Sequence, residues 1–203
     1  MTMILALDTS TAACTAALFD GSGDCVARRD AVIGRGHAER LVPMIAEMLD
    51  GRAADQVLVG VGPGSFTGIR VGIAAAHGLA IGWNANLAGM SSLALLATSA
   101  SKNSNVAVAV IGGHGELFVQ EFRSGVPAGA VTNLKPEVAA TVVRSNLVIG
   151  SGAHQLVDAR GWGEALEGLP SAADSLMLPE ALRSLPAKPI YARAPDAIVK
   201  VAA

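Results

Sequence analysis

The order of strand and helix patterns predicts an α/β fold of two lobes, each built on a mixed sheet flanked by helices. Residues 3–31 contain three short strand patterns in succession, and helix and strand patterns then alternate up to about residue 99. After a polar stretch at residues 102–105, the pattern of strand, small-residue turn and strand recurs. We therefore expect a duplicated architecture, with one lobe at residues 1–102 and another at residues 103–203.

Three strands open the first lobe, at residues 3–8, 13–19 and 25–31. The first two are apolar runs of strand length. A Thr-Ser-Thr turn and an Asp-Gly-Ser-Gly turn separate the three segments. The sequence therefore predicts a three-stranded meander.

Helices and strands alternate in the rest of the first lobe. Leu41, Ile45 and Met48 share one face of the first predicted helix, and Pro43 removes one backbone hydrogen bond and should bend it. Ser65 is the expected N-cap of the second helix. The predicted segments are the helix 36–49, the strand 56–61, the helix 66–82, the strand 87–89 and the helix 91–99.

The second helix is apolar on nearly every side, so more than its own sheet must cover it. Gly64, Gly68, Gly72, Ala76 and Ala80 recur every four residues and form a strip without bulky side chains. This strip fits either packing within the chain or close approach by a helix of another chain. Under the second alternative, Gly72→Glu should abolish pairing by adding bulk and an unpaired charge.

The second lobe is predicted less completely than the first. A Gly-Gly-His-Gly turn joins its first two strands, and a Gly-Ser-Gly turn leads from its third strand into a helix. A Pro-rich tail follows the last predicted helix. The predicted segments are the strands 106–111, 116–122 and 147–149, the helix after residues 150–152, and the helix 173–184.

Composition and net charge narrow the range of possible functions. The chain has 203 residues, is 51% hydrophobic and carries a formal net charge of −2. Such a chain buries a substantial core and is not intrinsically disordered. The weakly negative net charge gives no overall positive field that could bind phosphates, so we expect any nucleic acid to be held mainly by a partner.

Neither a secretory signal nor a membrane span is expected. The apolar run after Thr2 has five residues, no basic segment precedes it, and it ends at Asp8. The most apolar later stretch, residues 66–82, contains Arg70 and His77 and is interrupted by four glycines. We therefore expect a cytoplasmic protein without membrane contact.

Two common classes of enzyme site lack their residues in this sequence. No metal-binding spacing joins the four histidines, and no G-x-S-x-G nucleophile elbow is present. Cys14 and Cys25 are expected to remain thiols. The histidines are His37, His77, His114 and His154.

A weak nucleotide site is the remaining small-molecule hypothesis. Asp8, Thr9 and Ser10 follow the first strand, where a carboxylate and two hydroxyls can organise Mg²⁺ and its waters. Gly112 and Gly113 supply a second phosphate-type turn, although an apolar residue stands where an acidic one is usual. The glycine-rich string at residues 60–70 matches neither the Walker nor the dinucleotide fingerprint. A surface turn and close helix packing explain the same residues.

Four strings along the chain resemble the TsaB family, formerly called YeaZ, essentially from end to end. They are ILALDTS at residues 4–10, GHAERLVP at 36–43, GPGSFTGIRVG at 62–72 and PIYARAPDA at 189–197. The third string is very specific to that family. The loop at residues 111–114 departs from the Asp-Ala-Arg that is common there in the family, so any role assigned to that loop is open.

The resemblance implies a two-lobed fold of the actin, Hsp70 and sugar-kinase superfamily (ASKHA, ribonuclease H-like). It also implies a non-catalytic subunit that binds the catalytic subunit TsaD, with the ATPase TsaE as a further member. TsaD transfers threonylcarbamoyl to adenosine 37 of tRNA. Ser92 and Leu96 occupy the places of two metal-binding histidines in TsaD relatives, which implies lost catalysis. No cofactor is then required by this chain, and ATP with Mg²⁺ would bind weakly or at the partner interface.

The resemblance places the partner contact on the first two helices, and tRNA contact arises only through the complex. A homodimer is expected when the chain is alone. An independent actin-like ATPase or small-molecule kinase is the main alternative, and a metallo-glycopeptidase is a further one. The expected interface residues are His37, Glu39, Arg40, Leu41, Met44, Phe66, Thr67, Gly68, Arg70, Val71, Gly72 and Ala74.

Overall fold

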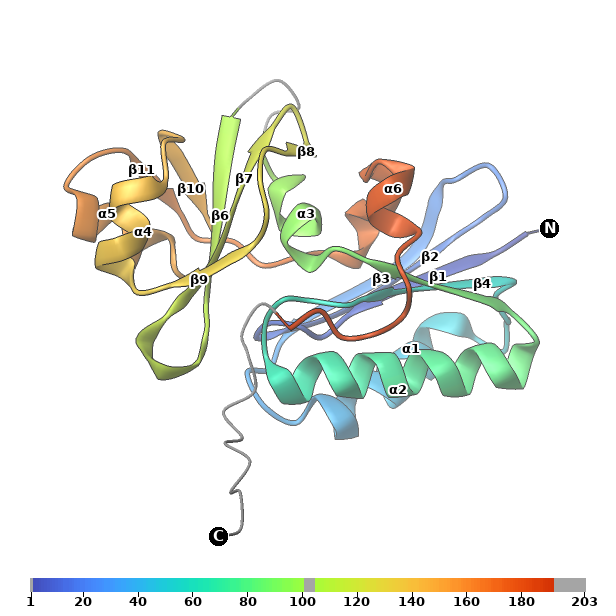
Figure 1. Cartoon of the computed structure of the whole chain (residues 1–203). Coiled ribbons are helices and arrows are strands. Elements are labelled where there is room, and N and C mark those ends of the chain that lie inside the picture. The colour runs from blue at the N-terminus through green and yellow to red at the C-terminus, as the bar shows by residue number, and fades with distance from the viewer. Residues whose placement is uncertain (1, 101–104, 192–203) are drawn as a thin grey trace, which may run out of the picture.

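The computed structural model describes residues 2–100 and 105–191, and these form two lobes (Figure 1). The predicted two-lobed α/β architecture with mixed sheets is confirmed. The predicted boundary at residues 102–103 lies outside the described residues. The elements of the first lobe are β1 (Ile4–Asp8), β2 (Ala13–Phe19), β3 (Cys25–Val32), α1 (His37–Leu49), β4 (Gln56–Gly60), α2 (Phe66–Trp83), β5 (Asn86–Met90) and α3 (Ser92–Ala97).

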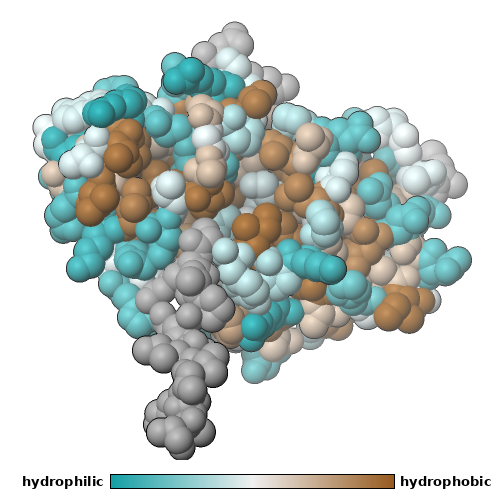
Figure 2. All heavy atoms as spheres, viewed as in Figure 1, coloured by the Kyte–Doolittle hydropathy of each residue, from teal (hydrophilic) through white to brown (hydrophobic). Residues whose placement is uncertain are grey.

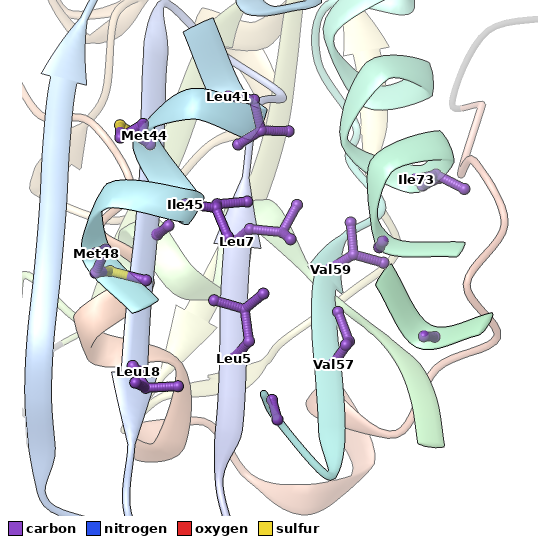
Figure 3. Close-up of a cluster of buried hydrophobic side chains, with 14 of the residues drawn as sticks. Leu5, Leu7, Leu18, Leu41, Met44, Ile45, Met48, Val57, Val59 and Ile73 are labelled. Atoms are coloured by element: carbon purple, nitrogen blue, oxygen red, sulfur yellow. The ribbon is translucent and has the colours of Figure 1, made fainter. Parts of the chain in front are cut away.

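The first sheet has the strand order β3-β2-β1-β4-β5. The meander β1–β2–β3 is antiparallel because short turns join its strands, whereas β1, β4 and β5 are parallel because α1 and α2 provide the crossovers between them. α1 and α2 lie side by side on one face of this sheet (Figure 1). Leu41 and Ile45 of α1 point at Leu5 and Leu7 of β1 in the core that results (Figure 3).

The opposite face of the first sheet packs toward the second lobe. Successive side chains of a strand point to opposite faces. Ala6 and Leu58 therefore belong to a second cluster, together with the buried side chains of α3 and with Val106 and Val108 of the second sheet. Because both faces are covered, β1 and β4 are continuous apolar runs, and the two lobes share this part of the core.

The second sheet has the order β11-β10-β6-β7-β8, with β9 also paired to β7. α4 and α5 pack together, and their buried residues share a cluster with side chains of β6, β7 and β10. The elements are β6 (Asn105–Ile111), the 3-10 turn η1 (Gly113–Gly115), β7 (Leu117–Arg123), β8 (Val126–Pro127), β9 (Thr132–Leu134), α4 (Pro136–Val142), β10 (Leu147–Ile149), α5 (Ala153–Arg160) and β11 (Glu164–Leu166).

The last described segment returns to the first lobe. The Ala172 amide donates to Thr15 Oγ1 at 2.8 Å, Leu185 forms a β-bridge with Gly89, and the Ile190 amide donates to the Val61 carbonyl at 2.9 Å. The single helix predicted at residues 173–184 is wrong. Pro179 lacks an N–H and separates the 3-10 helix η2 (Ala172–Met177) from α6 (Glu180–Arg183).

Smaller differences from the sequence predictions have local causes. β8, β9, α4 and β11 were not predicted, because short elements with mixed polarity carry little periodic signal. Cys14 is buried and Cys25 is exposed, and both are free thiols, as expected. No helix within the described ranges is both long enough and apolar enough to cross a membrane.

Candidate functional site: the helix pair and the cleft between the lobes

Asp8 lies at the end of β1 and is enclosed by its own neighbours. Its Oδ1 accepts hydrogen bonds from the Ser10 amide and from Ser10 Oγ, both at 2.7 Å, and its Oδ2 accepts one from Ser92 Oγ at 2.6 Å. Ser92 Oγ in turn accepts from the Gly62 amide at 3.0 Å. Burial raises the pKa of Asp8, although these hydrogen bonds oppose the shift.

Gly60 makes this arrangement possible. A Cβ at Gly60 would lie 1.8 Å from Asp8 Oδ2, so a larger residue on β4 would displace the carboxylate. Asp8 is therefore held in the core behind Ser10, and its two oxygens are occupied by chain donors. The carboxylate fixes the turn after β1.

The small-residue strip of α2 packs within the chain. A Cβ at Gly64 would lie 2.1 Å from the Ser10 carbonyl oxygen, and one at Gly68 would lie 2.0 Å from the Thr9 carbonyl oxygen. Thr9 Oγ1 donates to the Gly68 carbonyl at 2.7 Å. Of the two alternatives left open by the sequence, the strip therefore serves close approach to the chain's own β1–β2 turn.

This packing corrects the reasoning about Gly72. A Cβ at Gly72 would lie 2.5 Å from Thr9 Oγ1 and would also contact Leu7 and Val59. Gly72→Glu would therefore disrupt the chain's own core. The variant cannot isolate pairing with another chain.

The expected interface residues fall into an exposed group and a buried group. On α1, Glu39 and Arg40 are exposed, whereas Leu41 and Met44 lie in the core against the first sheet (Figure 3). His37 is also buried, with Nε2 at 3.1 Å from the Ala13 carbonyl oxygen. These three buried residues do not reach the outer surface of α1, because Leu41 and Met44 pack in the core against the first sheet and His37 lies against the start of β2.

On α2, the expected residues divide in the same way. Gly68 and Gly72 are buried, and Val71 is half-buried. The exposed stripe follows three- and four-residue spacing along the helix. It consists of Phe66, Arg70, Ala74, His77 and Ile81, and Thr67 is exposed beside its first residue.

Two exposed apolar side chains of the helix pair were missed by the sequence reasoning. Val42 of α1 is 50% exposed and Ile81 of α2 is 81% exposed. Both are apolar residues on outer helix faces, where polar residues are expected. A helical wheel of the sequence would show this departure. Ala46 and Gly78 are exposed on the same two helices and add little bulk to their outer faces.

A cleft of about 1020 Å³ lies between the lobes. Figure 2 shows apolar residues gathered on this side of the molecule where the two lobes meet. Ser10 lines the cleft from the first lobe, and Gly112 and Gly113 line it from the second. Of the expected nucleotide residues these three therefore share one cleft, whereas Asp8 and Thr9 are buried behind its wall.

An aromatic and cationic cluster forms one side of the cleft. The guanidinium carbon of Arg70 lies 3.6 Å from the centre of the Phe66 ring, and Arg70 Nε donates to Tyr191 Oη at 3.1 Å. The rings of Phe66 and Tyr191 are 5.9 Å apart. The cluster joins the start of α2 to the returning C-terminal segment, a contact between residues 121 positions apart that sequence alone did not indicate.

Ser92 and Leu96 are both buried in α3. Ser92 takes part in the Asp8 network, and Leu96 packs in the core shared by the two lobes. Within the described residues, no group of three or more His, Cys, Asp or Glu side chains is arranged to hold a metal ion.

Comparisons with known proteins agree with this fold. The family model for TsaD, tRNA N6-adenosine threonylcarbamoyltransferase, matches residues 31–139. The tRNA threonylcarbamoyladenosine biosynthesis protein TsaB of Escherichia coli is 35% identical over 149 residues, which cover 66% of this chain and 63% of that protein. An uncharacterized protein of Mycobacterium leprae is 33% identical, covering 97% of this chain and 56% of its own length. The chain thus spans little more than half of these curated relatives.

Solved structures align with almost the whole chain. YeaZ from Pseudomonas aeruginosa aligns with a TM-score of 0.79 and 31% identity, covering 94% of this chain and 100% of that one. A second Pseudomonas aeruginosa structure, described as similar to the peptidase YEAZ, aligns with a TM-score of 0.81 and 32% identity, over 95% of this chain and 100% of that one. From its sequence strings, its two mixed sheets and these matches, the chain belongs to the TsaB (YeaZ) family.

Proposed function

We propose that this chain is a non-catalytic subunit of the bacterial machinery that makes N6-threonylcarbamoyladenosine at position 37 of tRNA. It binds a TsaD-type catalytic subunit through the outer faces of α1 and α2. Involvement in this pathway is supported by family membership and by the similarity to the Escherichia coli tRNA threonylcarbamoyladenosine biosynthesis protein. The chain acts in the cytoplasm, and TsaE and tRNA join through the complex.

The observation that carries the binding proposal is the presence of three large apolar side chains that are exposed on the helix pair. Val42, Phe66 and Ile81 are 50%, 57% and 81% exposed, respectively. Small residues such as Ala46 and Ala74 lie on the same helices and permit close approach by a partner helix. Each large apolar side chain that a partner covers contributes about 1.5–3 kcal/mol if its burial is complete. A few such contacts are enough for a specific pair of subunits.

The accessory role is supported by the chemistry of the two places where an enzyme of this fold would act. Asp8 is buried with both oxygens engaged, so it is not presented to Mg²⁺ in the cleft. Ser92 and Leu96 provide neither an imidazole nor a carboxylate. Each feature argues against independent hydrolysis, and the alternative of an ATPase or kinase is therefore less well supported.

A charge placed on the outer helix face tests the proposal without disturbing the core. Ala74→Glu and Val42→Glu alter exposed helical positions and should leave the chain folded. Light scattering of each variant mixed with the TsaD subunit of the same organism should show no one-to-one complex, because an unpaired charge would be buried. The matched control is Val138→Glu on α4, where valine is 48% exposed.

The control and the two variants on the helix pair are expected to give opposite results. The unmodified chain and Val138→Glu should form the complex, whereas the two variants on the helix pair should not. A complex of unchanged affinity with both Ala74→Glu and Val42→Glu would overturn the interface. In the absence of TsaD, the same face forms a homodimer, so the two variants should also scatter as monomers while Val138→Glu remains dimeric.

A further inference from the structure

The outer side of β3 is the long open edge of the first sheet. β3 has eight residues and, within the described part of the chain, pairs with β2 alone. The opposite edge of this sheet differs, because Leu185 bridges Gly89 of β5. The edge strands of the second sheet, β8 and β11, have only two and three residues. An edge strand as long as β3 offers a row of backbone donors and acceptors to another strand.

The register between β2 and β3 shows which residues of β3 direct their backbone groups outward. One residue beyond the paired stretch, the Ile33 amide donates to the Ala12 carbonyl at 2.9 Å. Hydrogen-bonded and non-hydrogen-bonded pairs alternate along an antiparallel pair of strands. The residues at even positions, Arg28, Asp30 and Val32, therefore turn their N–H and C=O groups away from β2.

The side chains at these even positions form a self-complementary row on one face of β3. The row consists of Val26, Arg28, Asp30 and Val32, and all four are exposed. When a second copy of β3 runs antiparallel about Arg29, Arg28 of each copy faces Asp30 of the other. Val26 then faces Val32, which is 74% exposed. Opposite charges and β-branched residues that face each other across strands are favourable pairs.

The side chains and the backbone favour the same register. In the pairing about Arg29, facing residues on this row are also the residues whose backbone groups turn outward, so each such pair can exchange both hydrogen bonds. The two neighbouring registers that keep this backbone pattern place Arg28 opposite Arg28, or Asp30 opposite Asp30. Like charges directly opposite each other are unfavourable. The charges therefore select one register.

Asp30 is held in position before a second strand arrives. Its Oδ1 accepts a hydrogen bond from Ser171 Oγ at 3.0 Å and another from Thr15 Oγ1. These contacts restrict the carboxylate, so little side-chain entropy is lost when an arginine of another copy reaches the second oxygen. Arg28, two residues earlier on the same face, is exposed and can extend toward the neighbouring strand.

We propose that two copies of this chain pair through β3, antiparallel about Arg29, and so join their first sheets into one. The pair is weak, because a single strand buries little area and exposed ion pairs contribute little. It forms at chain concentrations well above those at which the helix-pair variants are compared by light scattering. No residue of β3 belongs to the proposed partner face on α1 and α2, so the two proposals can fail separately.

Arg29 keeps this pairing reversible. Its Nη1 donates to the Arg28 carbonyl at 2.9 Å and so occupies an acceptor that the second strand uses. Arg29 also faces its own copy at the two-fold axis, where two like charges oppose each other. Because the side chain is exposed, it can swing into solvent when the strands meet.

Two charge reversals test the pairing by sedimentation equilibrium at millimolar chain concentration and low salt. Every chain carries Ala74→Glu, which removes the α1–α2 face as a second contact, and this reference chain should dimerise. Arg28→Asp and Asp30→Arg each place like charges opposite one another, so each alone should dimerise at least about tenfold more weakly. An equimolar mixture of the two variants should dimerise like the reference chain, because every reversed charge then faces its opposite.

A disulfide reports the register directly and does not depend on the helix face. Facing residues of a non-hydrogen-bonded pair have Cα atoms about 4.5 Å apart, within reach of a disulfide. In a chain with Cys25→Ser, Arg29→Cys should therefore form a cross-linked dimer on mild oxidation. The matched control is Val32→Cys on the same strand, which should not cross-link because that position faces Val26 and not its own copy.

Circular dichroism of each variant confirms that it is folded. Dimerisation of both single reversals at the strength of the reference chain would overturn the proposal. A mixture of the two folded variants that stays monomeric would do the same. So would equal cross-linking at positions 29 and 32, or a reference chain that stays monomeric at millimolar concentration.

Discussion

Replacing Gly68 by alanine is expected to destabilise the fold, whereas the same replacement at Gly78 on the same helix is expected to stabilise it. A Cβ at Gly68 would lie 2.0 Å from the Thr9 carbonyl oxygen, while a Cβ at Gly78 would meet nothing within 4 Å. Both positions lie inside α2, so the gain in helix propensity is the same. The pair therefore isolates the cost of moving α2 away from the β1–β2 turn.

The magnitude follows from three contributions. Overpacking a tightly filled site costs about 1–3 kcal/mol. Displacement of the helix weakens the hydrogen bond from Thr9 Oγ1 to the Gly68 carbonyl, now 2.7 Å long, at a cost of about 1 kcal/mol. Alanine regains about 1 kcal/mol over glycine in a helix. We expect Gly68→Ala to lose about 1–3 kcal/mol and Gly78→Ala to gain up to about 1 kcal/mol.

Urea unfolding followed by circular dichroism measures both changes. Gly68→Ala should lower the midpoint and Gly78→Ala should raise it, without a change of slope in either case. Helix content in the absence of urea should be unaffected. A Gly68→Ala protein that unfolds at the midpoint of the unmodified chain would refute the assignment of the strip to packing within the chain.

The remaining predictions concern buried polar groups. Burial raises the pKa of Asp8, so this carboxyl adds stability that is fully present below its unfolded pKa near 3.8 and is lost as the pH rises through its folded pKa. The difference between the urea midpoints of the unmodified chain and Asp8→Asn should therefore change between neutral pH and about pH 4. A constant difference would contradict the raised pKa. Ser92→Ala removes the donor to Asp8 Oδ2 and the acceptor of the Gly62 amide. The free energy of unfolding, measured in urea, should fall by about 1–3 kcal/mol. Unchanged stability would show that water replaces the hydroxyl. Thr15→Val leaves the Ala172 amide without its acceptor and should cost a similar amount of stability. Hydrogen exchange should then be faster at Ala172, and equal exchange rates would rule out this contact as an anchor of the returning segment on the first lobe.

The fold was predictable where periodicity or turn chemistry was strong. α1, α2 and the opening meander were predicted within one or two residues at most ends, because apolar periodicity, Ser65 and the glycine turns mark them. β8 and β9 were missed because each has only two or three residues and neither is an apolar run followed by a glycine turn, as the equally short strand at residues 147–149 is. The helix predicted across Pro179 gave too little weight to the missing backbone donor.

The candidate site was predictable only in part. The sequence predicted one weak nucleotide site from Asp8, Thr9, Ser10, Gly112 and Gly113. Ser10, Gly112 and Gly113 line one cleft, whereas Asp8 and Thr9 are buried and do not line it. It also placed Leu41 and Met44 on an outer surface, yet they face the first sheet. Sequence spacing identifies an apolar helix face, but it does not say whether a sheet of the same chain or a partner covers that face.

Residue identity along the chain is enough to indicate the family and the order of most major elements. Three contacts could be known only from the folded chain: the small-residue strip of α2 lies against the β1–β2 turn, Asp8 is enclosed by Ser10 and Ser92, and Tyr191 returns to Arg70. These contacts join residues up to 121 positions apart. The physical reason is that burial and hydrogen bonding depend on what chain folding brings alongside a residue, which local pattern does not contain.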